Sequence, residues 1–384
     1  MSKKASYSKL VNSGKTIFAI MSELAQQHKA IDLSRGYPDF NPDQALIDLY
    51  CKQLNSSKNQ YAPVDGLFEL REQIALRMQE LYQADFSPET EITITNGATD
   101  ALFTTITALV REGDEVIIIE PAYDSYAPAV RLSGGIPVFV DMNMPGYSLN
   151  WENVQRALSG NTRMIIFNNP HNPTGTVFSA LDIERLKKVV QGTDIYILSD
   201  EVYEHIVFDD GVHESLAQHA KIKDQTIIVN SFGKTYHATG WRLGYILAPE
   251  HLTAEIRKTH QYSMYTVNTP VQHAFAEYLK TEKKYLEVKL LYQEKRDLLL
   301  KGLQGSQFKF KAAAGTYFQC VDYSDISDEK DMEFASRLVR EYGLATIPLS
   351  YFYKAKSDYK VLRLCFAKHP DTLKQALEVM HRVK

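Results

Sequence analysis

The fold class of this chain is best indicated by one stretch, Thr226-Ile227-Ile228-Val229-Asn230-Ser231-Phe232-Gly233-Lys234-Thr235. Four β-branched residues are followed at once by a polar turn and a lysine. A continuous run of this kind, without alternation of polar residues, is typical of a strand that is buried on both faces. The stretch therefore predicts an inner strand of a sheet, with Lys234 just beyond its carboxyl end.

Similar runs recur six more times from residue 92 onward, and most of them are followed by a helical stretch. These runs are Ile92–Thr95, Val116–Ile119, Pro137–Val140, Met164–Phe167, Ile195–Leu198 and Tyr245–Ala248. Buried strands that alternate with helices predict an α/β fold. We expect a mainly parallel, seven-stranded sheet that is covered by helices.

The two ends of the chain differ from this middle part. A helix is expected at 16–27, and a long charged helix at about 270–304. The tail then offers strand-like runs and helices, at Phe308–Lys311, Thr316–Val321, 331–342, Val361–Phe366 and the C-terminus. We therefore predict a large domain of residues 45–281. A small α+β domain would combine residues 1–44, with an N-terminal lid segment, and 282–384.

The composition excludes several classes of protein. The 384 residues are 44% hydrophobic and 23% charged, with a formal net charge of −4, which argues against disorder and against a nucleic-acid binder. Three widely separated cysteines argue against a disulfide framework or a cysteine-rich zinc site, and eleven histidines show no ligand spacing, so no metal is predicted. With neither a signal peptide nor a membrane-spanning run recognised, we expect a soluble cytoplasmic protein.

Polar segments follow five of the predicted strands. They are Asn96–Thr99, Glu120–Tyr123, Asn168–Gly175, Ser199–Tyr203 and Asn230–Lys234. Since ligands of open α/β sheets bind just beyond the carboxyl ends of the strands, we expect these segments to meet around one site. Gly97, Ala98 and Thr99 open a helix whose free backbone N–H groups suit a phosphate. A lysine, an acid and an anion site together are what pyridoxal phosphate (PLP) requires.

Motifs over essentially the whole chain occur in the order of a known family. Asn169–Gly175 and Ser231–Arg242 resemble class I aminotransferases of PLP fold type I. Leu33–Phe40, Asn59–Pro63 and Ser199–His205 resemble the kynurenine/glutamine-transaminase branch and, within it, the bacterial methionine aminotransferases. The resemblance implies a homodimeric transaminase that binds PLP in the large domain and acts on small-molecule amino acids and 2-oxo acids.

The resemblance also assigns roles to residues around the cofactor. Lys234 would form the Schiff base and, once released, move the Cα proton. Asp200 would keep the pyridine nitrogen protonated, although an aspartate after a strand can also be a helix N-cap. Asn172 and Tyr203 would donate to the phenolic oxygen of PLP. Tyr123 would lie over the ring, unless it is an ordinary core tyrosine.

The phosphate is assigned to a second group of residues. Ser231 and Arg242 match the family spacing around Lys234, and together with the helix start at residues 97–99 they would hold the phosphate. Tyr61 resembles the tyrosine that reaches the phosphate of the neighbouring subunit, which implies a dimer with shared sites.

Arg363 is a charged residue inside the apolar run Val361–Phe366, where a charge is unfavourable unless it is paired. A guanidinium fork suits bidentate capture of a carboxylate. Arg363 resembles the family arginine that binds the substrate α-carboxylate, with Gly36 and Asn172 nearby and Phe18 as an aromatic wall. The alternative for Arg363 is a structural ion pair.

The stretch Tyr262–Pro270 contains no basic residue where aspartate-type relatives use an arginine. A pocket without a countercharge should reject dicarboxylates, so methionine and aromatic amino acids are the predicted donors, with kynurenine or glutamine as further candidates. Arg35 and Tyr37 stand where relatives often carry glutamine and phenylalanine, which leaves the side-chain preference open. A carbon–sulfur β-lyase uses the same constellation and is the nearest alternative. A PLP-binding regulatory module would need a DNA-binding segment, which the sequence does not show.

Overall fold

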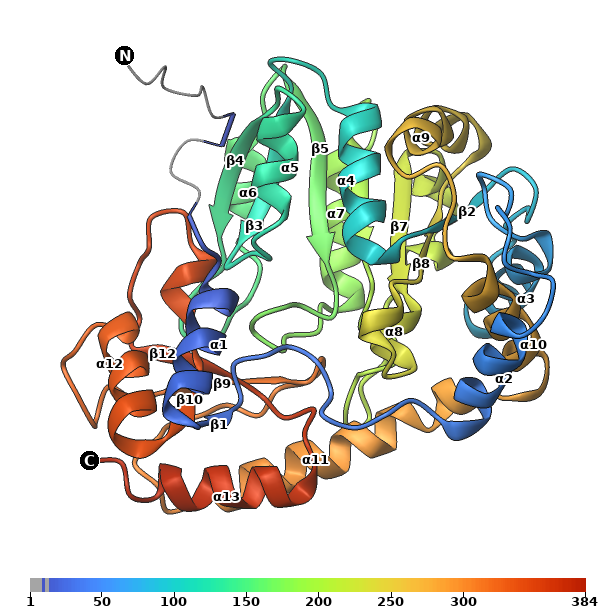
Figure 1. The fold of residues 1–384 in the computed structure, drawn as a ribbon. Helices are drawn as coiled ribbons and strands as arrows, with labels where there is room; N and C mark the ends of the chain where they lie inside the picture. Colours follow the sequence, from blue (N-terminus) through green and yellow to red (C-terminus); the bar gives the residue numbers. More distant parts are fainter. Residues whose placement is uncertain (1–8, 11–13) are drawn as a thin grey trace, which may run out of the picture.

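The computed structural model describes residues 9–10 and 14–384, so residues 1–8 and 11–13 of the predicted small domain lie outside the described residues. All seven predicted strands form one sheet (Figure 1). They are β2 (Ile92–Thr95), β3 (Glu115–Glu120), β4 (Ile136–Asp141), β5 (Thr162–Asn168), β6 (Tyr196–Asp200), β7 (Thr226–Ser231) and β8 (Gly244–Leu247). The order is β2-β8-β7-β6-β5-β3-β4, and only β8 runs antiparallel to its neighbours. The predicted α/β fold is confirmed.

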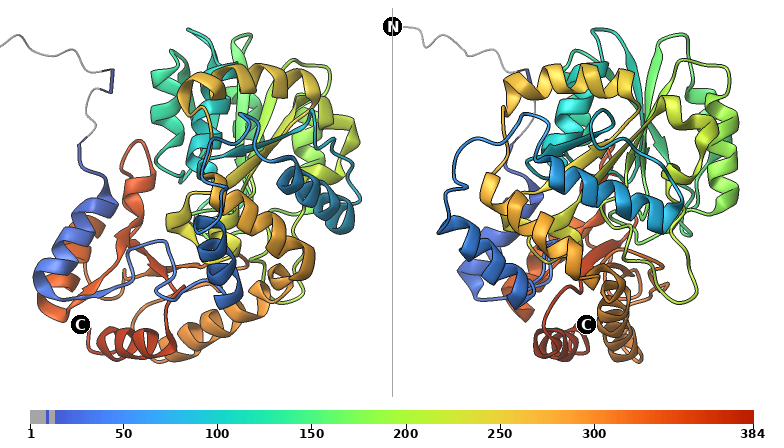
Figure 2. Two further views of the ribbon diagram at one scale, coloured as in Figure 1. Left: turned by 45° about the vertical axis from the view of Figure 1, so that its right-hand side comes forward. Right: turned by 90° about the vertical axis from the view of Figure 1, so that its right-hand side faces the viewer.

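Helices cover both faces of this sheet (Figure 2). One face is covered by α4 (Gly97–Leu109), α5 (Tyr126–Leu132) and α9 (Glu250–Ser263). The other carries α3 (Phe68–Tyr82), α6 (Trp151–Ala157), α7 (Ala180–Val190) and α10 (Thr269–Thr281), with α2 (Gln44–Leu54) against α10. Successive strand residues point to opposite faces, so Ile117 joins one apolar cluster and Ile118 the other. Burial on both faces explains why the strands lack polar alternation.

The N- and C-terminal parts of the chain pack together into the predicted α+β unit. Its helices are α1 (Ile17–His28), α11 (Val288–Leu303), α12 (Asp331–Arg337) and α13 (Pro370–Met380). Strands β11 (Ile347–Pro348), β12 (Val361–Cys365) and β9 (Phe318–Asp322) form an antiparallel sheet, and β1 (Ile31–Asp32) pairs with β10 (Leu344–Ala345). The β1–β10 pair joins the N-terminal residues to this unit.

Two predictions for the C-terminal part of the chain were wrong in detail, one for a strand and one for a helix. Phe308–Lys311 is not a strand, and it makes only one isolated bridge, between Lys309 and Asp322. The backbone beyond it is bonded instead by the Gln319 side chain, which donates to the Lys311 carbonyl and accepts from the Ala313 N–H. These bonds replace a strand ladder.

The helix predicted at 270–304 is broken between Thr281 and Val288. Glu282 adopts extended torsion angles, and a short 3-10 turn follows. The break redirects the chain from α10, which packs on α2 and α3, to α11, which packs on α13. Tyr285 anchors the turn by donating a hydrogen bond to Glu80 at 3.3 Å. Among the described residues, no helix combines the length and the apolar character that a bilayer crossing requires.

Candidate active site

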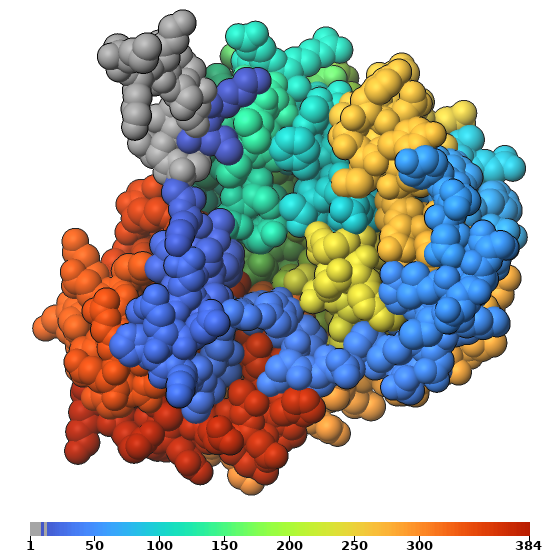
Figure 3. All heavy atoms as spheres, in the orientation of Figure 1, coloured from blue at the N-terminus to red at the C-terminus, as the bar shows by residue number. Residues whose placement is uncertain are grey.

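A cavity of about 480 Å³ lies at the carboxyl ends of the large sheet, between this sheet and the N- and C-terminal unit (Figure 3). In Figure 3 it opens as a hollow between the dark blue segment of α1 and the yellow segment around Lys234. Most of the site residues predicted from the sequence line it: Phe18, Gly36, Ala98, Thr99, Tyr123, Asn172, Asp200, Tyr203, Ser231, Lys234, Arg242 and Arg363. Gly97 and Tyr61 are not in the lining.

Lys234 lies on α8 (Phe232–Thr235), the short helix that begins where β7 ends. Its Nζ donates to the hydroxyl of Tyr317 at 2.9 Å and to the carbonyl of Gly36 at 3.3 Å. Part of the side chain faces the cavity, but burial of the amine lowers the pKa of Lys234 to about 8. In the described part of the chain, no carboxylate forms an ion pair with Lys234. The site therefore holds an amine that is readily deprotonated.

Asp200 ends β6 and is 4% exposed. Tyr126 donates a hydrogen bond to its carboxylate at 2.6 Å, and the Val202 N–H donates another at 3.4 Å. Burial nevertheless raises the pKa of Asp200 to about 6. A cationic partner would stabilise the ionised form of this carboxylate, because such a partner would offset its loss of hydration.

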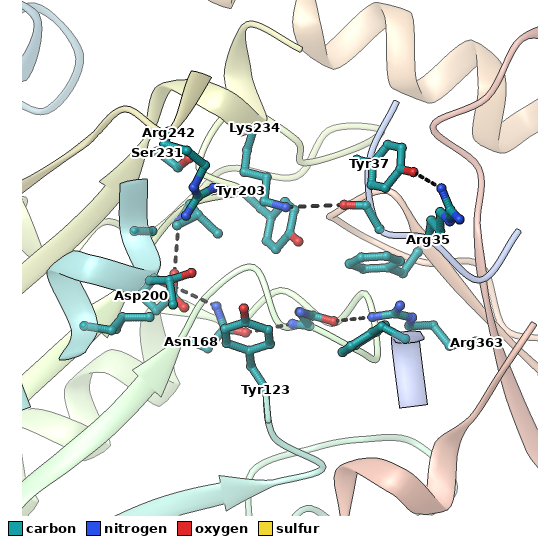
Figure 4. A pocket seen from close by; sticks show the side chains of 18 of the residues that line it. Arg35, Tyr37, Tyr123, Asn168, Asp200, Tyr203, Ser231, Lys234, Arg242 and Arg363 are labelled. Atoms are coloured by element: carbon teal, nitrogen blue, oxygen red, sulfur yellow. Dashed lines mark hydrogen bonds between the residues drawn. The ribbon is translucent and has the colours of Figure 1, made fainter. Parts of the chain in front are cut away.

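An anion-binding surface lies beside Lys234. The helix α4 begins at residues 97–99 without a side-chain cap, so its first N–H groups are free to bind a ligand. Arg242 and Ser231 complete this surface (Figure 4). Gly97 lies behind it with φ +77°, and a Cβ atom there would stand 2.6 Å from the Arg242 guanidinium. Only glycine therefore allows this approach.

Arg363 comes from the middle of β12 and is 1% exposed. Its Nη1 donates to Oδ1 of Asn172 at 3.0 Å and its Nη2 to the carbonyl of Ser34 at 3.2 Å, while Nε has no hydrogen-bond partner in the part of the chain that the structure describes. Phe318 lies 3.9 Å and Phe18 5.3 Å from the guanidinium, as ring-centroid distances. Among the described residues, Arg363 has no ion pair, so the alternative of a structural ion pair is not what the structure shows.

Two tyrosines complete the wall around Asp200 and Lys234. Tyr203 is 2% exposed, and burial raises its pKa well above the usual range. Lys234 Nζ stands 5.7 Å from the centre of its ring. Tyr123 lines the cavity with its ring packed edge-on against Tyr126. It is therefore a cavity residue and not part of the fully buried core.

Arg35 also lines the cavity, so the expectation of a pocket without a countercharge was incomplete. Its charge is partly balanced by Asp32, at 2.9 Å, and its guanidinium donates to the Tyr37 hydroxyl at 2.5 Å. The stretch 262–270, on which that expectation rested, does not line the cavity of its own chain.

Three residues with direct contacts to the site were missed. Asn168, at the end of β5, donates to the carbonyl of Asp200 and accepts from the Asn172 N–H. Its place at a strand end could have shown it. Tyr126 and Tyr317 carry no such signal, because Tyr126 lies beyond the polar segment Glu120–Tyr123 and Tyr317 lies inside the predicted strand Thr316–Val321, so each resembles an ordinary packed tyrosine.

Comparison with known proteins decides the family. The aminotransferase class I and II family matches residues 28–380. The chain is 45% identical to a methionine aminotransferase of Escherichia coli over 98% of both chains. It is 32% identical to human kynurenine–oxoglutarate transaminase 1 over 94% of both. This chain belongs to the class I and II aminotransferases. A solved E. coli methionine aminotransferase matches this aminotransferase with a TM-score of 0.97, at 45% identity over 99% and 100% of the two chains.

The aminotransferase therefore has PLP fold type I, pyridoxal phosphate as its cofactor, and small-molecule substrates. The cavity fits this cofactor on its own evidence. Within the described residues, it combines an amine without an ion pair, a buried carboxylate without a cationic partner and an uncapped helix start beside an arginine. These features match an aldehyde, a basic ring nitrogen and a phosphate, respectively.

Tyr61 is a predicted site residue that lies away from the cavity of its own chain. It is 79% exposed, and its ring packs edge-on against Tyr265, which is 50% exposed. Tyr262 nearby in the sequence is 86% exposed. Large aromatic side chains with this much exposure are unusual on a surface that faces only water.

Proposed function

We propose that this aminotransferase transfers the amino group of methionine and aromatic amino acids to a 2-oxo acid by a ping-pong reaction. The single observation that carries the proposal is Arg363, a buried guanidinium without a carboxylate partner among the described residues. Every amino acid and every 2-oxo acid brings an α-carboxylate, which is the missing partner.

Seven groups of the chain would surround the cofactor. Asp200 would pair with the ring nitrogen, and Asn172 and Tyr203 would donate to the phenolic oxygen. The α4 N-terminus at residues 97–99, with Ser231 and Arg242, would bind the phosphate, and Tyr123 would cover the ring. When bound, PLP supplies an electron-accepting ring that stabilises the charge left at Cα as a proton departs.

The remaining groups would act on the substrate. Arg363 binds the α-carboxylate, with Asn172 and the backbone of Gly36 beside it. This fixes the substrate so that its Cα–H faces the Lys234 amine. The Nζ atom of Lys234 would take the proton from Cα and deliver it to the cofactor. A pKa of about 8 keeps a useful fraction of the amine unprotonated near neutral pH.

The side-chain preference rests on the walls of the cavity. Phe18 and Phe318 present aromatic surface beside Arg363, which suits a thioether or an aromatic ring. The names of the relatives, methionine aminotransferase and kynurenine–oxoglutarate transaminase, agree with this class of substrate.

The assembly belongs to the same proposal. Tyr61 would reach the phosphate in the site of a second subunit, so the working unit would be a homodimer, and its exposure within the single chain supports this. The division into a cofactor-binding domain of residues 45–281 and a small domain of residues 1–44 and 282–384 also stays a proposal. Cytoplasmic location is expected from the three cysteines, none of which forms a disulfide.

A donor panel tests the proposal. Purified enzyme with PLP is mixed with single amino acids, and the change of cofactor absorbance and the 2-oxo acid formed are measured. We expect methionine and phenylalanine to react fastest and aspartate slowly. Release of pyruvate and ammonia from cystathionine, without transfer of its amino group, would instead identify a carbon–sulfur β-lyase. A Lys234→Ala variant with wild-type turnover would contradict the proposed chemistry.

A further inference from the structure

Tyr317 makes the shortest contact of the Lys234 amine, yet it does not line the cavity. Its hydroxyl accepts from Lys234 Nζ at 2.9 Å and donates to the Gly36 carbonyl at 2.8 Å. Lys234 also donates directly to this carbonyl, at 3.3 Å. The three groups therefore form a closed triangle of hydrogen bonds, which links the catalytic amine to the backbone segment beside Arg363.

The direction of each bond in this triangle follows from the chemistry of the groups. A carbonyl can only accept, so the Tyr317 hydroxyl gives its one proton to Gly36 and offers a lone pair to Lys234. A neutral amine has two N–H bonds and one lone pair. With one N–H directed to Tyr317 and the other to Gly36, the lone pair is left free to accept a proton.

The position of the Tyr317 ring is fixed on all sides. The preceding Thr316 has φ +63°, which is an uncommon conformation for a β-branched residue. Its N–H donates to Ile206, and the Tyr317 carbonyl accepts from Phe366. The ring is fully buried against Tyr203 and Tyr292. Strained backbone of this kind persists only where the surroundings hold it, and it gathers at functional sites.

We propose that Tyr317 is a positioning residue for Lys234, whose hydroxyl holds the amine with its lone pair free whenever the amine is not bound to the cofactor. This inference rests on the proposed function of Lys234. It gives Tyr317 a part in every proton transfer at Cα, because each one requires the released amine to stay in place. The contact also favours the protonated amine, since an ammonium group is the stronger donor.

The test compares Tyr317→Phe with Tyr292→Phe. Tyr292 is a matched control because it is buried in the same cluster and its hydroxyl has no hydrogen-bond partner among residues 9–10 and 14–384. Each enzyme is loaded with the amino form of the cofactor, which leaves Lys234 free. Reductive methylation of Lys234, followed by mass spectrometry across a pH series, reports the titration of the amine without any turnover. Single-turnover reaction with a 2-oxo acid then reports the rate.

We expect Tyr317→Phe to move the titration of Lys234 by about one pH unit toward acid. The limiting single-turnover rate should fall by about ten- to a hundredfold. Tyr292→Phe should leave both unchanged. A Tyr317→Phe enzyme with wild-type titration and rate would overturn the inference, and so would equal changes in both variants. If Lys234→Ala is inactive while Tyr317→Phe behaves as wild type, only the role of Tyr317 fails. Wild-type turnover by Lys234→Ala would overturn the proposed function itself.

Discussion

Replacing Arg363 with methionine should abolish most substrate recognition and yet leave the fold almost as stable as before. The side chain is 1% exposed, and among the described residues its charge is offset by hydrogen bonds to two neutral oxygens, from Asn172 and Ser34, and by the face of the Phe318 ring, without a carboxylate. An arginine that stabilised the fold would instead be expected to have a carboxylate partner at this depth.

The expected loss of activity follows from the missing carboxylate contact. A bidentate pair provides two charge-assisted hydrogen bonds, and taking about 3 kcal/mol for the pair gives a fall in kcat/KM of about 150-fold. The loss should be similar for methionine and phenylalanine, because both present the same α-carboxylate. A primary amine without a carboxylate, such as 2-phenylethylamine, should react at an unchanged rate.

The expected effect on stability is small because two contributions oppose each other. Burying the Arg363 charge destabilises the folded state by several kcal/mol, and each of the two hydrogen bonds stabilises it by about 1.5–3 kcal/mol. The free energy of unfolding of Arg363→Met, measured with urea and without substrate, should therefore differ from that of wild type by less than about 1 kcal/mol.

Arg77 provides the matched control. It is also buried, but it forms an ion pair at 3.5 Å with Glu204, which is equally inaccessible. Arg77→Met removes a cationic partner of the buried Glu204, which keeps its hydrogen bond from Tyr82 and its contact with His205, so the unfolding free energy should fall by about 3 kcal/mol. The reasoning is refuted if Arg363→Met is destabilised as strongly as Arg77→Met, or if its kcat/KM for methionine is close to that of wild type.

Three further predictions concern Asp200, Tyr126 and Tyr61. Because burial raises the pKa of Asp200 to about 6, its ionised form opposes folding above that pH. Asp200→Asn should therefore stabilise the cofactor-free chain by about 3 kcal/mol well above pH 6 and by nothing below about pH 4, by urea unfolding, while removing activity. Tyr126→Phe removes a hydrogen-bond donor to the Asp200 carboxylate, which should raise the pKa of Asp200 further. The acid limb of the pH–rate profile should therefore move to higher pH, and a limb at the wild-type pH would contradict this. In mixed dimers, one subunit carries Lys234→Ala, which is inactive, and the other carries Tyr61→Phe, which binds the phosphate less well. Such dimers should regain activity, since one of their two sites combines an intact Lys234 with an intact Tyr61. Failure of mixing to raise activity would argue against a shared site.

The strands of the large sheet could be predicted from the sequence because a strand that is buried on both faces consists of a continuous apolar run. The tail was harder to predict. Glu282 and Lys283 both have a high helix propensity, so the sequence predicts no break there. The helix is interrupted because α10 and α11 pack on different partners. Phe308–Lys311 has the composition of a strand, but the Gln319 side chain takes the backbone bonds that a ladder would need.

By itself, the sequence determined which chemical groups follow each strand, and hence that an amine, an acid and an anion site would meet at one edge of the sheet. Lys234 and Asp200 are placed in this way, because each lies at or just beyond the carboxyl end of a buried strand. Only the tertiary structure decided what surrounds these groups. Tyr126 meets Asp200 across 74 positions of the chain, and Tyr317 meets Lys234 across 83. Hydrogen-bond partners and loss of hydration arise where distant segments pack together, and no local pattern in a sequence encodes them.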